Sequence, residues 1–332
     1  MTILVTGGCG FIGTNFIYNF LSSSREKLVN IDKLTYAANQ ETSKIVHPNY
    51  QFVQVDIVDT NNLHDIISQY KPRLVVHFAA ETHVDRSIKS PINFVNTNIM
   101  GTYSLLKACL EYYTGLSGDD RNGFKLINVS TDEVYGELEL EDQGFTEDST
   151  LAPNNPYSAS KASADLLARS FYKTYGLPVI TARCSNNFGP YQHKEKLIPK
   201  IVYSVKSGEH IPIYGQGRQR RDWLFVLDHV DALITILRLG QPGQIYNIGG
   251  GAEIENRVLA MRVCKIAAQL LGREPNTHVS LIKYVDDRPG HDFRYAMRSD
   301  FLESVSGWKV KHSFDKALEK TIAWYLFSSE KS

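Results

Sequence analysis

The chain has 332 residues, 42% of them hydrophobic and 22% charged, which excludes extensive disorder and suits a globular protein whose core is shared between two domains. Thirty-six basic residues balance thirty-six acidic ones, so no net charge draws the molecule towards nucleic acid or an anionic membrane surface. The chain opens without a basic leader and no apolar run approaches the ~20 residues of a membrane helix, so neither a targeting segment nor a membrane partner is expected.

Short apolar runs alternate with helical patterns through the first half of the chain. Strands are predicted at 3–6, 28–31, 51–55, 74–78, 125–129 and 179–183, and the helices between them include 11–21, 91–113 and 156–175. This alternation is typical of a parallel sheet with helices on both faces. The fold class is therefore α/β, with a Rossmann-type doubly wound parallel sheet in an NAD-binding domain of residues 1–185.

Beyond about Asn186 the pattern changes to shorter pieces rich in Gly, Pro and Arg. We expect 186–221 and 249–332 to form a smaller C-terminal α/β lobe that faces the substrate, and 222–248 to return to the first domain. A strand and helix are predicted within 222–239, and helices at 256–271 and 313–327. Polar stretches at 117–123 and 137–150 are expected to be surface loops.

A glycine-rich turn follows the first predicted strand. Gly7, Gly10 and Gly13 are spaced three apart at the entry to a helix, which lets the backbone approach a pyrophosphate and presents helix N-terminal amides to it. Phe11 and Ile12 belong to the same turn. A glycine turn without a ligand is the alternative, but Asp32 lies about twenty residues on, as in dinucleotide-binding units.

Asp32 indicates which dinucleotide is bound. A carboxylate here accepts hydrogen bonds from a ribose 2'-hydroxyl and repels a 2'-phosphate, so NAD is preferred over NADP. Lys33 leaves the second possibility open, because a basic residue can accommodate the phosphate. The ends of the third and fourth strands would line the same crevice through Asp56, Ile57, Ala79, Ala80 and Glu81.

Two groups suited to proton transfer follow the fifth predicted strand. Tyr157 and Lys161 share one face of a helix, where an ammonium can favour the tyrosinate; a purely structural pair is the alternative. Asp132 and Glu133 are adjacent carboxyl groups at the end of the strand, where a solvated turn is the alternative. Like charges close together raise one pKa, so one group can act as an acid and the other as a base.

These motifs resemble the extended short-chain dehydrogenase/reductase family, whose members mostly act on nucleotide-linked sugars. Within it, the string from Ser130 to Gly136 is most similar to that of the sugar 4,6-dehydratases. The resemblance runs from Thr2 to about Tyr325, with further matching stretches at 32–37, 79–87, 156–161, 184–192, 195–199, 221–223 and 287–292.

The resemblance implies a three-step reaction. Tyr157 would act as base during oxidation at carbon 4, with Thr131 holding that oxygen and Lys161 holding the cofactor ribose. The carbon 5 hydrogen is then alpha to a ketone, and its loss gives an enolate that the site can stabilise. Glu133 would take that proton, Asp132 would release water from carbon 6, and hydride would return to carbon 6. NAD is regenerated, so it should stay bound through turnover.

Further binding residues come from the resemblance alone. For NAD they are Leu34, Thr35, Thr97 and Asn187, beside Tyr157 and Lys161. For the nucleotide sugar they are Thr82, Thr131, Asn186, Glu195, Lys196, Leu197, Tyr214, Arg221, Asn256, Arg288 and His291. Any one of them could be a surface charge or a core polar group. Arg218 to Arg221 also permits a nucleic-acid interpretation, which a run this short in a neutral chain does not favour.

Several positions depart from the family pattern. His193-Lys194 replaces an aromatic-proline type of pair, Gly251-Ala252-Glu253 replaces a more usual His/Gly-Asn-Glu run, Arg298 stands where aspartate is common, and the loop 137–147 is short. These departures leave the nucleobase of the substrate open: dTDP-glucose is the favoured substrate, and UDP-glucose is the second candidate.

Other functions remain as alternatives. A nucleotide-sugar 4-epimerase would share Tyr157 and Lys161 but has no need of Asp132-Glu133, and decarboxylases or GDP-mannose dehydratases usually carry Ser-Glu there. A non-catalytic NAD-binding sensor would have lost part of the proton-transfer set, which is complete here.

Location and assembly are the last expectations. The four cysteines lie far apart, without disulfide or zinc spacing, so we expect a cytoplasmic protein and no metal site. The helices 91–113 and 156–175 are apolar on more than one side, and family members pair such helices, which predicts a homodimer with a four-helix interface.

Overall fold

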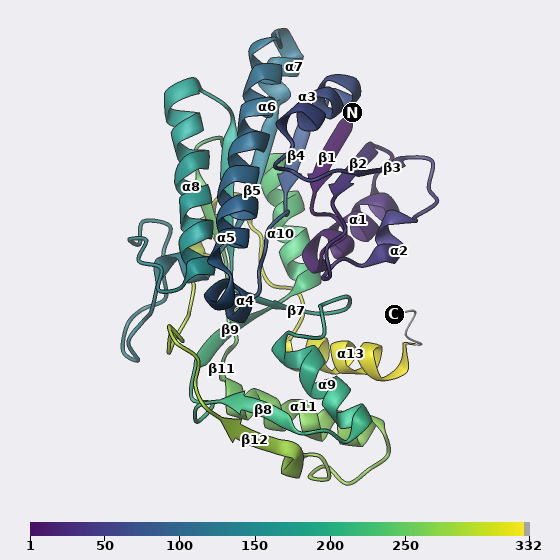
Figure 1. Ribbon diagram of the computed structural model, residues 1–332, viewed down its shortest axis with the longest axis vertical. Coiled ribbons are helices and arrows are strands. Elements are labelled where there is room, and N and C mark those ends of the chain that lie inside the picture. Colours follow the sequence, from purple (N-terminus) through teal and green to yellow (C-terminus); the bar gives the residue numbers. More distant parts are fainter. Residues whose placement is uncertain (329–332) are drawn as a thin grey trace.

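A seven-stranded parallel sheet forms the larger lobe of the protein (Figure 1), in the order β10-β6-β5-β4-β1-β2-β3. The computed structural model describes residues 1–328, so the last four residues of the predicted 249–332 segment lie outside the described part. The strands are β1 (Thr2–Thr6), β2 (Lys27–Asp32), β3 (Tyr50–Gln54), β4 (Leu74–His77), β5 (Lys125–Thr131), β6 (Val179–Cys184) and β10 (Ile245–Ile248). The predicted doubly wound parallel sheet is confirmed.

Helices cover both faces of this sheet, which explains why its strands are apolar on both sides. On one face α1 (Phe11–Ser23) packs with α10 (Val226–Leu239); on the other lie α3 (Thr60–Tyr70), α6 (Thr102–Thr114) and α8 (Pro156–Tyr175). The strand order reverses between β1 and β4, and α/β sheets bind ligands outside the carboxyl ends of strands at such a point.

Helix α8 has the bounds that the sequence predicts. Asn155 closes a capping box with Ser158, Pro156 occupies the first helical turn, and Gly176 at φ 69° ends the helix. These end signals are local, which is why they can be recognised in the sequence.

The predicted helix 91–113 is not a single α-helix. It divides into α5 (Pro91–Phe94), a π-helical segment η1 (Val95–Gly101) and α6. The buried Asn98 amide in η1 donates to the Glu81 carbonyl and the Ser160 hydroxyl, while its oxygen accepts from the Glu81 N–H. These long-range bonds hold the wide turn in place, and nothing local in the sequence predicts them.

The smaller lobe lies below the large sheet in Figure 1 and has its own apolar core. A three-stranded sheet orders β11 (Glu253–Glu255), β9 (Arg220–Phe225) and β7 (Asn186–Phe188), and a two-stranded sheet pairs β12 (Ile282–Val285) with β8 (Ile211–Tyr214). Helices α9 (Leu197–Ser207), α11 (Asn256–Leu270) and α13 (Phe314–Phe327) pack against one another. Of the segment 222–248, α10 and β10 join the larger lobe, whereas β9 stays in the smaller sheet.

The remaining elements are short. They are α2 (Gln40–Ser43), α4 (Val84–Lys89), α7 (Gly118–Gly123), α12 (Asp300–Ser306) and the 3-10 turns η2 (Asp132–Tyr135) and η3 (Val279–Leu281). The stretch 117–123, expected to be a loop, thus contains one short helix. Within residues 1–328, no helix combines the length and apolar character that crossing a bilayer requires.

Candidate functional site

One cleft of about 870 Å³ runs between the lobes at the carboxyl ends of the strands. It collects the predicted site residues from the glycine turn, from the ends of β2 to β6, from α8 and from the smaller lobe. Of the predicted catalytic, cofactor-binding and substrate-binding residues, Leu34 and Asp132 are the two that do not line it. The cleft is large enough for an extended ligand.

The glycine turn fits a dinucleotide pyrophosphate. Gly7 has φ +70°, and a Cβ there would lie 2.4 Å from the Ala79 backbone nitrogen; a Cβ on Gly13 would lie 2.6 Å from the Gly7 carbonyl oxygen. Side chains are therefore excluded from both positions. Gly10 precedes α1 without a side-chain cap, so the first amides of the helix remain available to an anion at the cleft.

Asp32 lies at the far end of this turn. One carboxylate oxygen accepts from the Cys9 N–H at 3.0 Å and the other from the Leu34 N–H at 2.8 Å. Leu34 thus orients Asp32 through its backbone N–H, a role for which the Leu34 side chain does not need to line the cleft. Burial raises the pKa of Asp32, while these two bonds and Lys33 act in the opposite direction.

Lys33 is already paired with a carboxylate. Its ammonium lies 3.3 Å from Asp56 and 3.4 Å from the Thr97 hydroxyl. Two carboxyl groups, Asp32 and Asp56, therefore line this end of the cleft against one lysine. This charge balance suits a ribose hydroxyl better than a 2'-phosphate.

The proton-transfer groups meet where β5 ends. The Thr131 hydroxyl accepts from the Glu133 N–H at 3.3 Å and donates to the Asp132 carboxylate at 3.2 Å. Thr131 therefore caps the η2 turn and fixes the direction in which the two acidic side chains leave the strand. A cap of this kind explains why a threonine precedes the acidic pair.

Asp132 is an unusual carboxyl group because it is only 1% exposed. Burial raises its pKa well above the ordinary value, Glu133 and Asp222 raise it further, and Thr131 and Arg221 lower it. One oxygen of Asp132 and one of Glu133 are buried without a partner. Burial and the charge of Glu133 thus favour the protonated form of this carboxyl group, the form from which an acid donates.

Tyr157 and Lys161 lie together on α8, but their electrostatics differ from the sequence expectation. Burial, followed by Glu133, raises the pKa of Tyr157 well above its ordinary value, and a hydrogen bond with Thr131 lowers it. The Lys161 ammonium donates to the Val129 carbonyl at 2.7 Å, and burial lowers its pKa. The expected stabilisation of a tyrosinate by lysine is therefore outweighed by burial.

Arg221 brings a fixed positive charge to the same end of the cleft. Its guanidinium donates to the carbonyls of Arg220 at 2.7 Å, Phe293 at 3.1 Å and Asp292 at 2.8 Å, and lies 4.4 Å from the Tyr295 ring centroid. Burial lowers its pKa, whereas Tyr295, Glu133 and Asp132 raise it. Three carbonyl acceptors hold the side chain in one orientation.

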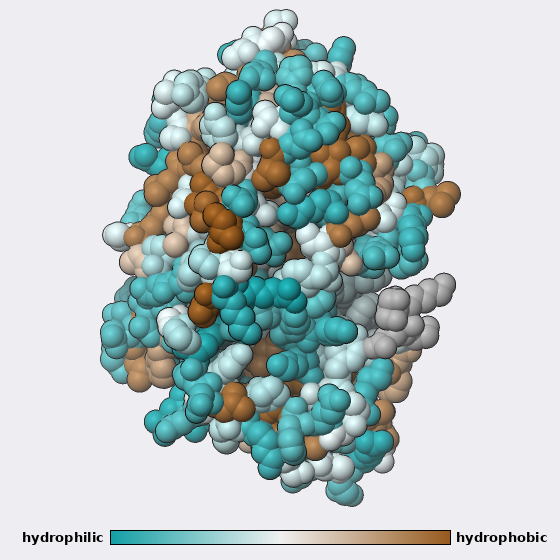
Figure 2. All heavy atoms as spheres, in the orientation of Figure 1, coloured by the Kyte–Doolittle hydropathy of each residue, from teal (hydrophilic) through white to brown (hydrophobic). Residues whose placement is uncertain are grey.

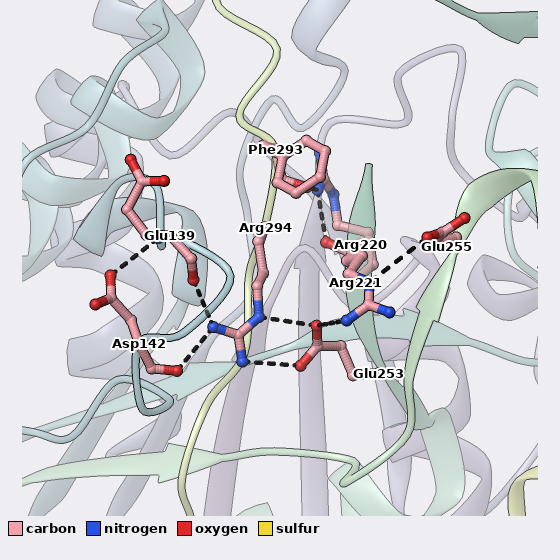
Figure 3. A network of polar contacts seen from close by, with 8 residues as sticks. All are labelled: Glu139, Asp142, Arg220, Arg221, Glu253, Glu255, Phe293 and Arg294. Atoms are coloured by element: carbon pink, nitrogen blue, oxygen red, sulfur yellow. Dashed lines mark hydrogen bonds and ion pairs between the residues drawn. The ribbon is translucent and has the colours of Figure 1, made fainter. Parts of the chain in front are cut away.

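A second arginine builds the frame around Arg221 (Figure 3). Arg294 makes a two-pronged contact with Glu253 at 2.8 and 3.0 Å and donates to the carbonyls of Glu139 and Asp142, each at 2.8 Å. The loop after η2 is thereby joined to β11. The sequence carries no local signal for the role of Arg294, because its partners lie 41 and more than 150 positions away.

The outer end of the cleft is built around Asp85, another residue to which the sequence gave no role. Its carboxylate accepts from the Tyr214 hydroxyl at 2.9 Å and lies 3.5 Å from the Arg288 guanidinium. The Arg288 Nε is buried without a partner. His291 is bonded to Asp287 at 2.6 Å, and burial, followed by Arg288, lowers its pKa to about 4, so it is neutral near pH 7.

The remaining predicted substrate residues line the wall between these two ends. Lys196 donates to the Thr82 carbonyl at 2.8 Å across the cleft, and burial lowers its pKa. Asn186 and Asn256 each carry a buried side-chain oxygen without a partner. Unpartnered buried oxygens of this kind are available to a polar ligand.

Comparison with known proteins places this arrangement among nucleotide-sugar enzymes. The family model described as GDP-mannose 4,6 dehydratase matches residues 4–321. The dTDP-glucose 4,6-dehydratase of Haemophilus influenzae is 46% identical over 338 residues, covering all of both chains. The dTDP-glucose 4,6-dehydratase 1 of Escherichia coli K12 is 44% identical, covering 99% of this chain and 94% of that protein.

Solved structures agree with these relatives. A dTDP-glucose 4,6-dehydratase from Streptomyces venezuelae, determined with NAD and TYD bound, has a TM-score of 0.89 and 39% identity, covering 99% of this chain and 98% of that one. A UDP-glucose 4-epimerase from Thermus thermophilus, in complex with NAD, has a TM-score of 0.86 and 27% identity, covering 99% and 100%. Dehydratases and epimerases thus share this fold.

Proposed function

The chain belongs to the GDP-mannose 4,6-dehydratase family, and from this premise we propose that it is an NAD-dependent lyase that converts dTDP-glucose to dTDP-4-keto-6-deoxy-glucose. The resemblance read from its motifs is thereby confirmed at the level of the family. The observation that carries the proposal is the buried carboxyl group of Asp132, whose pKa is raised by burial and by Glu133, next to Glu133 and Tyr157, which both line the cleft.

Tyr157 acts first in the proposed reaction. NAD held at the glycine turn and by Asp32 would supply a hydride acceptor for carbon 4 and a hydride donor for carbon 6, and its oxidised ring would bring a positive charge to the site. Thr131 shares a hydrogen bond with Tyr157 and holds the sugar oxygen from which Tyr157 takes the proton. Because burial keeps the pKa of Tyr157 high, proton removal depends on charge that enters with the ligands.

Glu133 and Asp132 then divide the elimination between them. Glu133 lines the cleft and removes the proton at carbon 5, which the neighbouring ketone has made acidic. Asp132 keeps its proton until water leaves carbon 6, because burial and the charge of Glu133 disfavour its ionised form. The two carboxyl groups differ in exposure, and this difference supports their assignment to opposite roles.

A 4-epimerase is the second candidate, since such an enzyme from Thermus thermophilus shares the fold at 27% identity. Epimerisation needs the oxidation step but no acid at carbon 6. The acidic pair and the full-length dehydratase relatives favour elimination. UDP-glucose remains the alternative to dTDP-glucose because the departures at 193–194 and 251–253 lie near the nucleotide.

The proposal is tested by incubating the purified protein separately with dTDP-glucose and UDP-glucose and measuring the product mass. A dehydratase yields a 4-keto-6-deoxy sugar lighter by one water, an epimerase yields an unchanged mass, and a binding protein returns the substrate. A variant with Asp132→Asn and Glu133→Gln is the matched control and should form no product. Full activity of this variant would overturn the proposed chemistry.

We also propose a homodimer that forms through the helices at the left of Figure 1. Ile92 on α5, Met100 in η1 and Leu166 on α8 are 59%, 49% and 57% exposed, and Figure 2 shows apolar side chains gathered on this side of the larger lobe. Exposed apolar groups on adjacent helices suit a second copy of the chain. Sedimentation should give a dimer, and Leu166→Glu should shift it towards monomer.

A cytoplasmic location completes the proposal. The four cysteines are free and buried, with no disulfide among residues 1–328, as expected of a protein that works in a reducing compartment.

A further inference from the structure

Residues 189–196, called the strap below, cross the cleft from α1 to α4. At the α1 end, the Asn15 side-chain amide donates to the Pro190 carbonyl at 3.0 Å, and the ring of Tyr18 stacks on that of Tyr191 with centroids 5.6 Å apart. The strap therefore starts beside the helix whose N-terminus faces the predicted pyrophosphate position. Its other end reaches the helix that follows β4.

At the α4 end, four side chains close a ring. The Arg86 guanidinium donates to Glu195 at 2.7 Å and lies 3.6 Å from the centre of the Tyr36 ring. The Tyr36 ring meets His193 edge-on at 5.5 Å, and His193 in turn lies 3.7 Å from Glu195. Each residue touches two others, so the contacts form a closed circuit between the two lobes.

This ring lies at the mouth of the cleft. Arg86, His193 and Glu195 line the cleft, and their side chains are 45%, 25% and 31% exposed. Tyr36 comes directly after Thr35, at the end of the cleft that Asp32 marks as the ribose position. A dinucleotide stretched from Asp32 past α1 towards Tyr157 would have to pass the strap to leave.

We propose that the ring of Tyr36, Arg86, Glu195 and His193 is a clasp that slows release of the dinucleotide. The inference rests on the proposed function in one respect, namely that NAD occupies the glycine turn. Hydride removed in the first step must return in the last, so a dinucleotide that left in between would strand the sugar as an intermediate. A closed mouth keeps the two halves of the reaction on one cofactor.

The stability of the clasp comes from several contacts that must break together, because each contact is weak by itself. A half-exposed ion pair or an arginine over a tyrosine ring contributes little alone. Opening the strap breaks both together, because Arg86 is a member of each. His193 stands where the family pattern has an aromatic residue, and here it contacts both the edge of Tyr36 and the Glu195 carboxylate.

The test measures release directly. Protein loaded with NADH is mixed with a large excess of NAD, and the decay of energy transfer from protein tryptophan to bound NADH gives the dissociation rate; Trp223 lines the cleft. Arg86→Gln should accelerate release roughly three- to tenfold. Tyr36→Ala should do the same, whereas Tyr36→Phe, which keeps the ring, should release NADH at the wild-type rate.

The double variant makes the test stricter. If the residues form one circuit, combining Arg86→Gln with Tyr36→Ala should add little to either single change, because one break already opens the clasp. Lys311→Gln is the matched control: it breaks an exposed ion pair with Asp231 that is also 2.7 Å long but does not line the cleft, and it should leave NADH release unchanged. Circular dichroism and thermal unfolding establish that each variant is folded.

Two results would overturn the clasp: release at the wild-type rate from both folded Arg86→Gln and Tyr36→Ala, or equal acceleration by Lys311→Gln. The assay contains no nucleotide sugar, so it separates this inference from the proposed function. A protein that retains NADH through Arg86 but leaves dTDP-glucose untouched keeps the clasp and loses the proposed reaction. If the protein converts dTDP-glucose but the Arg86 and Tyr36 variants release NADH at the wild-type rate, the proposed reaction stands and the clasp does not.

Discussion

The two ends of the cleft treat charge in opposite ways. At the inner end Asp132, Tyr157, Lys161 and Arg221 are all less than 10% exposed, and burial is the first cause of each pKa shift. At the outer end the side chains of Asp85 and Arg288 are 30% and 21% exposed and paired with each other. At the inner end, burial shifts the pKa of each group away from its ordinary value. At the outer end, Arg288 is paired with Asp85, and a diphosphate would replace Asp85 as the partner of Arg288.

The largest effect is expected at the inner end. Tyr157→Phe removes the phenolic oxygen proposed to take the proton of the carbon 4 hydroxyl, while keeping the ring contact with Phe94. We expect kcat to fall by roughly 10² to 10⁴, with little change in bound NADH. Steady-state assays of 4-keto product measure the loss. Activity within tenfold of wild type would break the comparison, because the buried tyrosine would then be a structural group.

The next effect concerns Asp132. Asp132→Asn keeps the shape of the side chain but cannot donate a proton, and we expect product formation to fall by about 10² or more. Solvent deuterium incorporation at carbon 5 should continue, because Glu133 is intact. A variant that eliminates water at the wild-type rate would show that the acid lies elsewhere.

The same substitution has a second consequence, for stability against pH. The folded pKa of Asp132 is raised, so its contribution to stability is fully present below the unfolded pKa of about 3.9 and is lost as pH rises towards the folded value. Asp132→Asn should therefore gain in melting temperature relative to wild type as pH rises above about 4. A difference between the two proteins that does not change with pH would contradict the buried-acid description.

A smaller effect is expected at the outer end. Arg288→Gln removes the charge proposed to meet the diphosphate, and dTDP affinity should weaken roughly ten- to a hundredfold, as for a charge-assisted hydrogen bond. Titration calorimetry with dTDP measures it, and kcat should change less than the dissociation constant. Loss of kcat with unchanged binding would move Arg288 to the inner group.

The smallest effect has the opposite sign. The Asp85 carboxylate contacts both Tyr214 and Arg288, so it competes with a diphosphate for the charge of Arg288. Asp85→Asn should tighten dTDP binding by roughly two- to fivefold at low salt, and the gain should shrink as ionic strength rises. Weaker binding would mean that Asp85 orients Arg288 for its ligand instead of competing with it.

Features that depend on neighbouring residues could be predicted from the sequence. The strands β1 to β6, both ends of α8 and the glycine turn all carry local signals, whereas β10 is not among the predicted strands; most residues named from the family motifs do line one cleft. Features that depend on distant partners could not. The pKa direction of Tyr157 follows from burial by both lobes, and the contacts of Asp85 and Arg294 join segments more than 100 and 40 positions apart.

The π-helical segment η1 shows how such distant requirements alter a local element. It carries Thr97 and Asn98 in its buried wall, and Gly101 ends it where a Cβ would lie 2.5 Å from the Ile57 side chain. A π turn holds one residue more than an α turn. If one residue were deleted here, α5 and α6 could join as one continuous α-helix. The segment before the deletion would then be rotated by about 100° about the helix axis relative to α6. The scaffold would survive such a shortening, but Asn98 would no longer reach the segment after β4. The extra residue of η1 thus sets the angle about the helix axis at which Thr97 faces the cleft and Asn98 faces the segment after β4, relative to the side chains of α6.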